Sequence, residues 1–170
     1  FFPSEASSIL HESLSQPENI TLMAVKGIRR VVGFGLAVPA VKRRDISRVL
    51  TGLLPLQHTF YLSELGVQSG FRGKGLGKEL VRHRLELIDK QRYTHVVLRT
   101  SSVRNASYEM YMKMGFDDMG VYMEVPARRL DGRVTTDRRL FLSKVLSHMD
   151  GMEEETSDPG TWGTASETEV

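Results

Sequence analysis

The chain of 170 residues contains no cysteine. Disulfide bonds, thiolate zinc sites and a cysteine nucleophile are therefore excluded, which fits a reducing compartment, and we expect a cytoplasmic or nuclear location. The sequence also lacks an apolar run near the roughly 20 residues that span a bilayer, and no signal peptide is visible, so we expect no membrane partner. This length suits one domain, and 40% apolar residues are enough for its core.

Basic residues are not balanced by acidic ones along most of the chain. Residues 150–170 hold seven acids and no bases, so the net charge of +2 becomes +9 over residues 1–149. A basic body favours an anionic ligand or partner, although a solvated basic surface explains the charge equally well. We predict one domain at 1–149 and a disordered acidic tail at 150–170, because the tail is rich in Gly, Ser, Thr and Glu. Its end, Glu-Thr-Glu-Val, resembles a PDZ ligand and predicts a weak contact of that type.

A glycine-rich loop, VQSGFRGKGLG from Val67 to Gly77, lies between a strand pattern at Thr59–Val67 and an amphipathic helix pattern at Lys78–Gln91. Glycine allows positive φ and close approach of a ligand, and a helix start directs unpaired N–H groups at one point. The loop therefore predicts a phosphate or pyrophosphate site, although such a loop alone is as often only a turn. The cationic residues around it are Arg72, Lys74 and Lys78.

Neither of two common phosphate-binding motifs matches the sequence well. No Gly-Lys-Ser/Thr closes it, so it is not a Walker A loop. The surrounding chain does not read as repeated strand–helix–strand units, which makes a dinucleotide-binding fold a poor match.

Periodicity predicts the remaining elements. Strands are predicted at Ile20–Lys26, Val31–Val38, Thr59–Val67, His95–Thr100, Val121–Val125 and Arg139–Leu146. Helices are predicted at Glu5–Ser15, Lys78–Gln91 and Ala106–Met114, with a short helix within Val41–Leu54. Asn105 is a good N-cap for Ala106–Met114, and Gly115 is a good stop. The apolar stripe of Lys78–Gln91 consists of Leu80, Val81, Leu85, Leu87 and Ile88.

A second motif, VRNASYEMYMKMGF, runs from Val103 to Phe116. Together with Arg72-x-x-Gly75-x-Gly77, this order resembles the GNAT superfamily of acetyl-CoA-dependent N-acetyltransferases. The resemblance covers roughly Val31 to Leu146. It implies an α/β (α+β) fold with a central mixed, mostly antiparallel sheet, flanking helices and a cofactor cleft between splayed strands. That family normally begins with one more strand and helix than the sequence before Glu5 offers.

The resemblance also implies which residues would hold acetyl-CoA. The backbone of Leu65 to Val67 would pair with the pantetheine arm, and the Val67 N–H would face the thioester oxygen. The amides from Arg72 to Lys78 would take the pyrophosphate. The implied cofactor-binding set is Leu65, Gly66, Val67, Arg72, Gly73, Lys74, Gly75, Leu76, Gly77, Lys78, Asn105, Ser107 and Tyr111. No metal is expected.

Tyr111 and Glu64 are the catalytic candidates. By resemblance, Tyr111 occupies the Y-x-x-x-G-F position near the sulfur, and a phenol of pKa near 10 can protonate a thiolate whose thiol has a pKa near 8.5. Tyr108 could substitute, and either tyrosine can instead be a core aromatic. Glu64 lies on the strand that enters the loop, where several GNAT subfamilies carry an acid that takes the amine proton. The alternative bases are His58, His83 and His95.

The sequence therefore predicts transfer of an acetyl group from acetyl-CoA to a primary amine by direct attack. Few acids are available for a polyamine site, so a protein or peptide amine is slightly favoured. Arg99 stands where the ribosomal-protein N-terminal acetyltransferase subfamily usually carries glutamate, which argues against that specificity. Tyr122–Asp137 is long for a connection before the last strand and is expected to border the acceptor groove.

Two other functions remain open. A GNAT-like module could bind acyl-CoA without transferring its acyl group. A nucleic-acid-binding domain would use the basic body, but the chain lacks an aromatic RNA-binding signature and a helix-turn-helix pattern.

Overall fold

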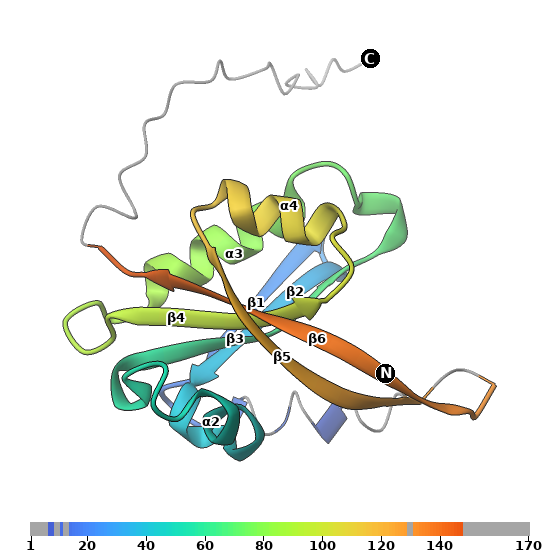
Figure 1. Ribbon diagram of the computed structural model, residues 1–170. Coiled ribbons are helices and arrows are strands. Elements are labelled where there is room, and N and C mark those ends of the chain that lie inside the picture. The colour runs from blue at the N-terminus through green and yellow to red at the C-terminus, as the bar shows by residue number, and fades with distance from the viewer. Residues whose placement is uncertain (1–6, 9–10, 12–13, 129–130, 148–170) are drawn as a thin grey trace, which may run out of the picture.

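The computed structural model describes residues 7–8, 11, 14–128 and 131–147. Its centre is a six-stranded sheet of order β1-β2-β3-β4-β6-β5, in which β3 and β4 are the parallel pair (Figure 1). The strands are β1 (Ile20–Lys26), β2 (Arg30–Pro39), β3 (Thr59–Val67), β4 (His95–Ser101), β5 (Asp117–Arg128) and β6 (Val134–Val145). The helices are α2 (Arg44–Leu50), α3 (Leu76–Leu87) and α4 (Ala106–Lys113), with 3₁₀ turns η1 (Ala40–Lys42), η2 (Leu56–His58) and η3 (Ser69–Phe71). The predicted mixed, mostly antiparallel sheet is confirmed.

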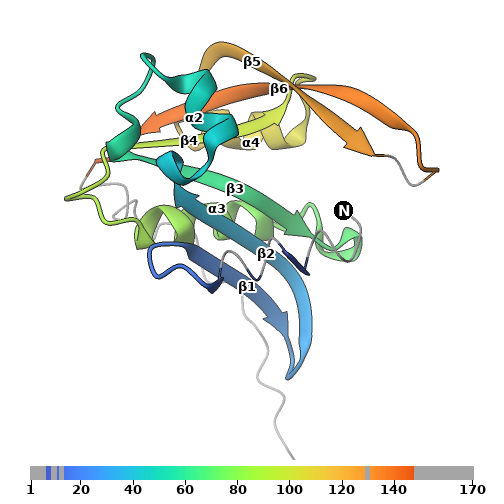
Figure 2. The ribbon, with the colours of Figure 1, turned by 90° about the horizontal axis from the view of Figure 1, so that it is seen from below.

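One face of the sheet is covered by α2, and the other face is covered by α3 and α4 (Figure 2). Because side chains of a strand alternate between faces, the inner strands β2, β3, β4 and β6 contribute to two apolar clusters. On one face, Val96 and Leu98 of β4 pack with Val81 of α3 and Tyr111 of α4. On the other face, Tyr61, Val97 and Phe141 pack with Ile46 and Leu50 of α2.

A bulge in β3 changes which face its later side chains occupy. The register with β2 passes from Ala37↔Leu62 to Leu36↔Glu64, so Ser63 is the extra residue. As a result, Leu62 and Leu65 both pack against the α3–α4 cluster, although three positions separate them. The same shift turns Glu64 toward the face that α2 covers.

β3 and β4 run together for only part of their length. They pair from Thr59↔His95 to Leu62↔Leu98, and β3 then continues to Val67 while β4 continues to Ser101. Beyond Leu62 and Leu98 neither strand has the other as a ladder partner. This is the splaying that the sequence predicts, and it begins directly beside the bulge.

The last two strands are longer than predicted, and the prediction of a long connection at Tyr122–Asp137 is wrong. Tyr122–Arg128 lies in β5 and Val134–Asp137 lies in β6, and their pairing continues to Arg128↔Val134. This hairpin extends beyond the rest of the sheet (Figure 1). Pro126 fits because β5 is an edge strand, which needs no ladder bond on its outer side.

The helix after the glycine loop is shifted relative to its prediction. It begins at Leu76 rather than Lys78 and ends at Leu87 rather than Gln91, because Ile88 is extended and residues 89–93 form a turn. Leu87 is 59% exposed and does not belong to the apolar stripe, whereas Arg84 is buried within it.

Two predicted segments fall mainly outside the described residues. Of the predicted helix Glu5–Ser15, Ser7, Ser8, His11 and Leu14 are helical. The acidic tail, with its PDZ-like end, is outside them, so the domain boundary at 149 stays a prediction. Within the described part of the chain, no helix combines the length and apolar character needed to cross a membrane.

Candidate active site

The glycine loop forms the start of α3, as predicted. Gly73 and Gly75 have φ values of +72° and +82°, which other residues rarely adopt, and Gly75 is the N-cap residue of α3. Arg72 Nε donates a hydrogen bond to the Val67 carbonyl at 2.9 Å and so ties the loop to the end of β3. The first amides of α3 therefore lie next to the end of the splayed strand, where the helix dipole is positive.

Cations around this helix start have no acidic partners among the residues that the structure describes. Arg72, Lys74 and Lys78 are exposed, and no carboxylate among the described residues lies within 4 Å of their nitrogens. Lys74 also lies 5.7 Å from the centre of the Phe71 ring, which Lys26 and Arg30 approach at 5.5 Å and 5.4 Å. The loop thus offers free positive charge to an anion such as the pyrophosphate of CoA, and Lys26 and Arg30 add charge that sequence reasoning missed.

The predicted pantetheine strand, Leu65 to Val67, lies beyond the point where β3 and β4 part. Its other edge is paired with β2, as in Gly33↔Val67. A Cβ on Gly66 would lie 2.4 Å from the Phe34 ring, so the glycine allows that ring to lie against the strand. The residues fit an extended ligand that adds along the free edge.

The start of α4 lies close to α3. A Cβ on Gly77 would lie 3.8 Å from Met110 Sδ, so the first turn of α3 sits against α4. Asn105 Oδ1 accepts hydrogen bonds from the Ser107 and Tyr108 amides, both at 3.1 Å, and confirms the predicted cap. Asn105 and Ser107 are exposed, and their contact with acetyl-CoA stays a prediction.

The two tyrosines of α4 differ in their polar neighbours. The Tyr108 hydroxyl donates to the Asp118 carboxylate at 3.3 Å. Tyr111 packs edge-on against Phe116, with 5.6 Å between ring centres. Burial raises the pKa of Tyr111, and the Arg84 guanidinium opposes that rise.

Glu64 lies on the opposite side of β3 from Tyr111. Burial raises the pKa of Glu64 above its ordinary value of 4.5, and Arg99, Arg43 and Arg139 oppose the increase. A carboxylate with a raised pKa is a stronger base than an exposed one.

Arginines and acids from α2 with its N-cap, from β4 and from β6 gather around the face that carries Glu64. Arg43 makes two hydrogen bonds to Asp45, both at 3.1 Å, and Arg99 reaches the same carboxylate at 3.4 Å. Arg139 binds Asp137 at 3.1 Å. Sequence reasoning missed this cluster because its members lie far apart in the chain.

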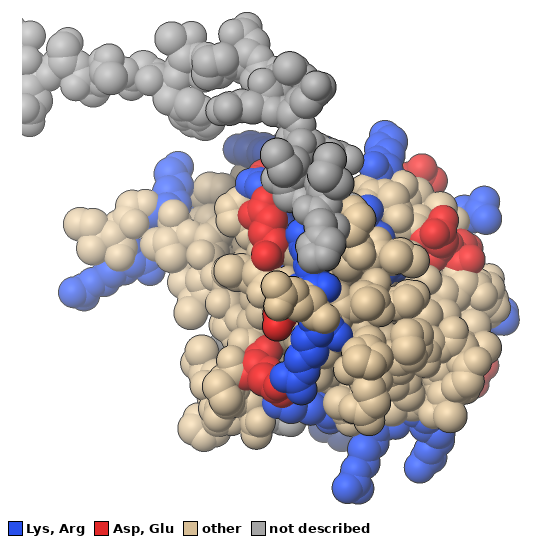
Figure 3. All heavy atoms as spheres, turned by 90° about the vertical axis from the view of Figure 1, so that its left-hand side faces the viewer, with Lys and Arg blue, Asp and Glu red and all other residues tan. Residues whose placement is uncertain are grey.

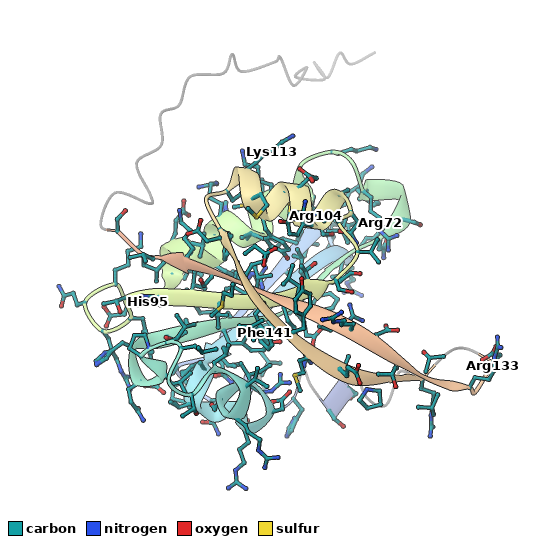
Figure 4. The ribbon with its side chains drawn as sticks, viewed as in Figure 1. Arg72, His95, Arg104, Lys113, Arg133 and Phe141 are labelled. Carbon is teal, nitrogen blue, oxygen red and sulfur yellow. The ribbon has the colours of Figure 1, made fainter. Side chains whose placement is uncertain are left out.

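The three histidines considered as alternative bases lie against backbone carbonyls or a threonine hydroxyl. The Nδ1 atom of His58 lies 2.9 Å from the Arg92 carbonyl, and that of His83 lies 3.1 Å from the Glu79 carbonyl. His95 Nδ1 contacts Thr94 Oγ1 at 2.9 Å. Figure 4 places His95 at the end of β4 away from Arg72. Since β3 and β4 are paired at that end, the geometry favours Glu64 over His58 and His95.

Arg84 is a third feature that sequence reasoning missed. Its side chain is fully buried and reaches from α3 to the carbonyls of Leu36 and Glu64, at 2.8 Å and 3.0 Å. Its position within the stripe, four residues after Leu80 and four before Ile88, is the signal that could have revealed it. Among the described residues, no group of three or more His, Asp or Glu side chains could hold a metal ion.

Comparison with known proteins extends these observations. The family model described as "Acetyltransferase (GNAT) family" matches residues 1–116. N-acetyltransferase 8B of Rattus norvegicus is 41% identical over 71 residues, which are 42% of this chain and 32% of that protein. N-acetylaspartate synthetase of Homo sapiens is 41% identical over 63 residues, which are 37% of this chain and 21% of that protein. The chain thus spans a third or less of these two relatives.

Solved structures share the fold. Ribosomal-protein-alanine N-acetyltransferase of Brucella melitensis has a TM-score of 0.60 and 21% identity, with 84% of this chain and 78% of that chain covered. An N-acetyltransferase of Staphylococcus aureus Mu50 has a TM-score of 0.61 and 16% identity, with 84% and 77% covered. At these identities the likeness concerns the fold alone.

Proposed function

This chain belongs to the acetyltransferase (GNAT) family, and we propose that it transfers the acetyl group of acetyl-CoA to a primary amine. One observation carries the proposal: the glycine-capped start of α3, with its exposed cations, lies at the end of the β3 edge that β4 leaves free. An anion-binding helix start beside a free strand edge suits a cofactor with a pyrophosphate and an amide-containing arm.

The proposed reaction uses Glu64 as the base and Tyr111 as the acid, and these two residues lie on opposite sides of β3. Glu64 takes a proton from the amine, directly or through water, because an alkylamine with a pKa near 10.4 is mostly protonated at neutral pH. The amine nitrogen then forms a bond to the thioester carbon, and the carbon–sulfur bond breaks. Tyr111 gives its proton to the departing thiolate. The nitrogen loses two protons in becoming an amide: the first passes from Glu64 to solvent, and the second, which Glu64 takes up after the attack, passes through water to Tyr111 and restores both groups.

Two classes of acceptor amine have support. The scarcity of acids favours a protein or peptide amine over a polyamine. The arginines around Glu64 favour a second class, a primary amine that carries a carboxylate, because Arg99 holds Asp45 only at 3.4 Å and could bind a substrate carboxylate while the amine faces Glu64. The name N-acetylaspartate synthetase, which states an amino-acid product for a relative, supports this second class.

Transfer of labelled acetyl groups tests the proposal. The acceptor panel contains peptides with free N-termini, peptides with only lysine amines, polyamines, arylamines, amino acids and amino-acid amides, with a no-acceptor control for hydrolysis. Transfer above that control establishes the activity. Preference for aspartate over its diamide, lost in Arg99→Met but kept in Arg48→Met on α2, supports the carboxylate-bearing class. Binding of acetyl-CoA without any transfer supports the non-catalytic module.

Nucleic-acid binding has less support. On the face shown in Figure 3, acidic side chains lie among the basic ones. A phosphate backbone is usually bound by a continuous basic stripe.

A further inference from the structure

Arg84 is the only charged residue with a buried side chain among those that the structure describes. No carboxylate in the described residues lies within 4 Å of it, since it forms none of the ion pairs found there. Burying a cation without an anionic partner is costly, and an arginine needed only for packing could be replaced by an apolar residue of similar size. The position therefore calls for a role beyond packing.

The Arg84 guanidinium forms a clamp at the bulge of β3, because it hydrogen-bonds the backbone of both β2 and β3. Arg84 Nη1 donates to the carbonyls of Leu36 and Glu64, which face each other across the bulge, and Nε donates to the Leu80 carbonyl at 3.1 Å. A bulge disrupts the ladder and leaves backbone groups in need of partners. Because this bulge sets the face on which Glu64 lies, the clamp also fixes the place of the proposed base.

Gly35 of the neighbouring strand β2 leaves space for the Arg84 side chain. A Cβ on Gly35 of β2 would lie 2.9 Å from Arg84 Nε and 3.1 Å from Arg84 Cδ. The arginine can lie in this position only because residue 35 has no side chain. Gly35 thus offers a way to disturb Arg84 without removing it.

One nitrogen of the Arg84 guanidinium makes no hydrogen bond to the described residues. Arg84 Nη2 is buried and has no hydrogen-bond partner in the described part of the chain. Tyr111 packs in the same buried cluster as Val81 and Leu85, the α3 residues on either side of Arg84, and Arg84 and Tyr111 each shift the pKa of the other. Glu64 is the other group whose charge raises the pKa of Arg84, and Arg84 is the group whose charge lowers the pKa of Tyr111.

We propose that Arg84 is a positioning residue for acetyl transfer, which holds the Glu64 bulge in place and keeps a positive charge beside the Tyr111 hydroxyl. The inference rests on the proposed function. When Tyr111 gives its proton to the CoA thiolate it becomes a buried anion, and the guanidinium stabilises that anion until a proton returns. Arg84 itself neither gains nor loses a proton in this step.

A double-mutant cycle tests the inference. Arg84→Met should lower kcat at least tenfold while the Kd of acetyl-CoA changes less than threefold. In a Tyr111→Phe background the same change should lower kcat by a factor at least threefold smaller, because the charge beside Tyr111 then has no role and only the support of the Glu64 bulge is lost. The matched control is Arg82→Met on the exposed side of α3, where Arg82 binds Glu79 and Glu86. An equal loss in both backgrounds, or no loss, overturns the inference.

Two further variants and a second readout keep the test independent of folding and of activity. If Arg84→Met does not fold, Arg84→Gln, which removes the charge but keeps a hydrogen-bond donor, and Gly35→Ala replace it, and the same non-additivity with Tyr111→Phe is expected. The titration of Tyr111, followed by the ¹³Cζ NMR signal that Tyr111→Phe removes, should begin at higher pH in Arg84→Met but not in Arg82→Met. An unchanged titration overturns the inference. If the wild-type protein transfers no acetyl group, the proposed function fails alone, and the titration still decides whether Arg84 supports Tyr111.

Discussion

The Tyr108 hydroxyl donates a hydrogen bond to the Asp118 carboxylate at 3.3 Å. This contact commits Tyr108 to a neighbour on β5, whereas Tyr111 on the same helix has Arg84 as its charged neighbour. A hydroxyl has a single hydrogen, so one that is donated to a carboxylate is not directed at a thiolate at the same time. The two tyrosines therefore form a matched pair for testing the proposed acid.

We predict that Tyr111→Phe lowers kcat at least tenfold and leaves the affinity for acetyl-CoA nearly unchanged. The loss of one general acid typically costs a factor of about 10² to 10⁴ in rate. Tyr108→Phe should change kcat less than threefold and instead lower the melting temperature, because it removes a hydrogen bond worth about 1 kcal/mol. Steady-state kinetics with isothermal titration of acetyl-CoA measures both. Unchanged turnover in Tyr111→Phe would remove Tyr111 from the mechanism.

Glu64 should give the pH–rate profile its acidic limb. Its pKa is raised by burial, so the base becomes protonated and inactive at a higher pH than an exposed glutamate would. We expect kcat to fall on acidification in the wild-type protein, and Glu64→Gln to lower kcat at least tenfold at neutral pH and abolish that limb. Glu124→Gln, at an exposed position of β5, is the control. If the profile of Glu64→Gln is not shifted, Glu64 is not the base.

The same substitution should stabilise the fold. Because the folded-state pKa of Glu64 is above the unfolded value, folding favours the protonated form, and stability falls as pH rises through the folded-state pKa. Glu64→Gln removes the buried charge, so its melting temperature should exceed that of the wild type by a few degrees at pH 8. The difference should shrink below pH 4.5, where the wild-type side chain is also neutral in both states. Thermal melts at the two pH values measure it, and an equal or lower melting temperature at pH 8 would contradict the expected cost of burial.

Local signals were sufficient to predict the parts of the site that lie within one stretch of chain. Thr59–Val67 is a strand with the predicted ends, and Asn105 caps α4 as its residue type suggests. Both depend on neighbours a few residues away. The binding and catalytic roles assigned to these residues by resemblance remain predictions, because no ligand contact tests them.

Features that depend on pairing between distant segments could not be predicted. The bulge at Ser63 arises from the register with β2, which no pattern within β3 specifies. Arg84 is polar in an amphipathic pattern, and its acceptors lie 48 and 20 residues away along the chain. The outer half of β5 was missed because its side chains alternate between half-buried and exposed without a buried apolar face.

The left-handed glycine at the start of α3 provides a test of the proposed phosphate-binding role of the loop. We predict that Gly75→Ala costs about 1–2 kcal/mol, because φ is +82° and a Cβ at this position strains the backbone. A Cβ on Gly75 would meet no atom within 4 Å, so the effect comes from the backbone alone. Relaxation of the loop should weaken acetyl-CoA binding at least fivefold. Gly70→Ala, also in open space and without a left-handed φ, should leave stability and binding unchanged. Equal acetyl-CoA affinity in both variants would show that the loop conformation does not matter for binding.

Asn105 has two proposed roles, which different substitutions separate. Its Oδ1 caps α4 through the Ser107 and Tyr108 amides, so Asn105→Ala should cost about 1 kcal/mol of folding free energy. Asn105→Ser keeps a cap and should preserve the melting temperature. If the asparagine amide also contacts the pantetheine arm, the shorter serine cannot reach it, and acetyl-CoA should bind at least threefold more weakly. We expect this weakening because Asn105 is exposed at the start of α4, and α4 lies against the first turn of α3. Wild-type acetyl-CoA affinity in Asn105→Ser would limit Asn105 to its role as a cap.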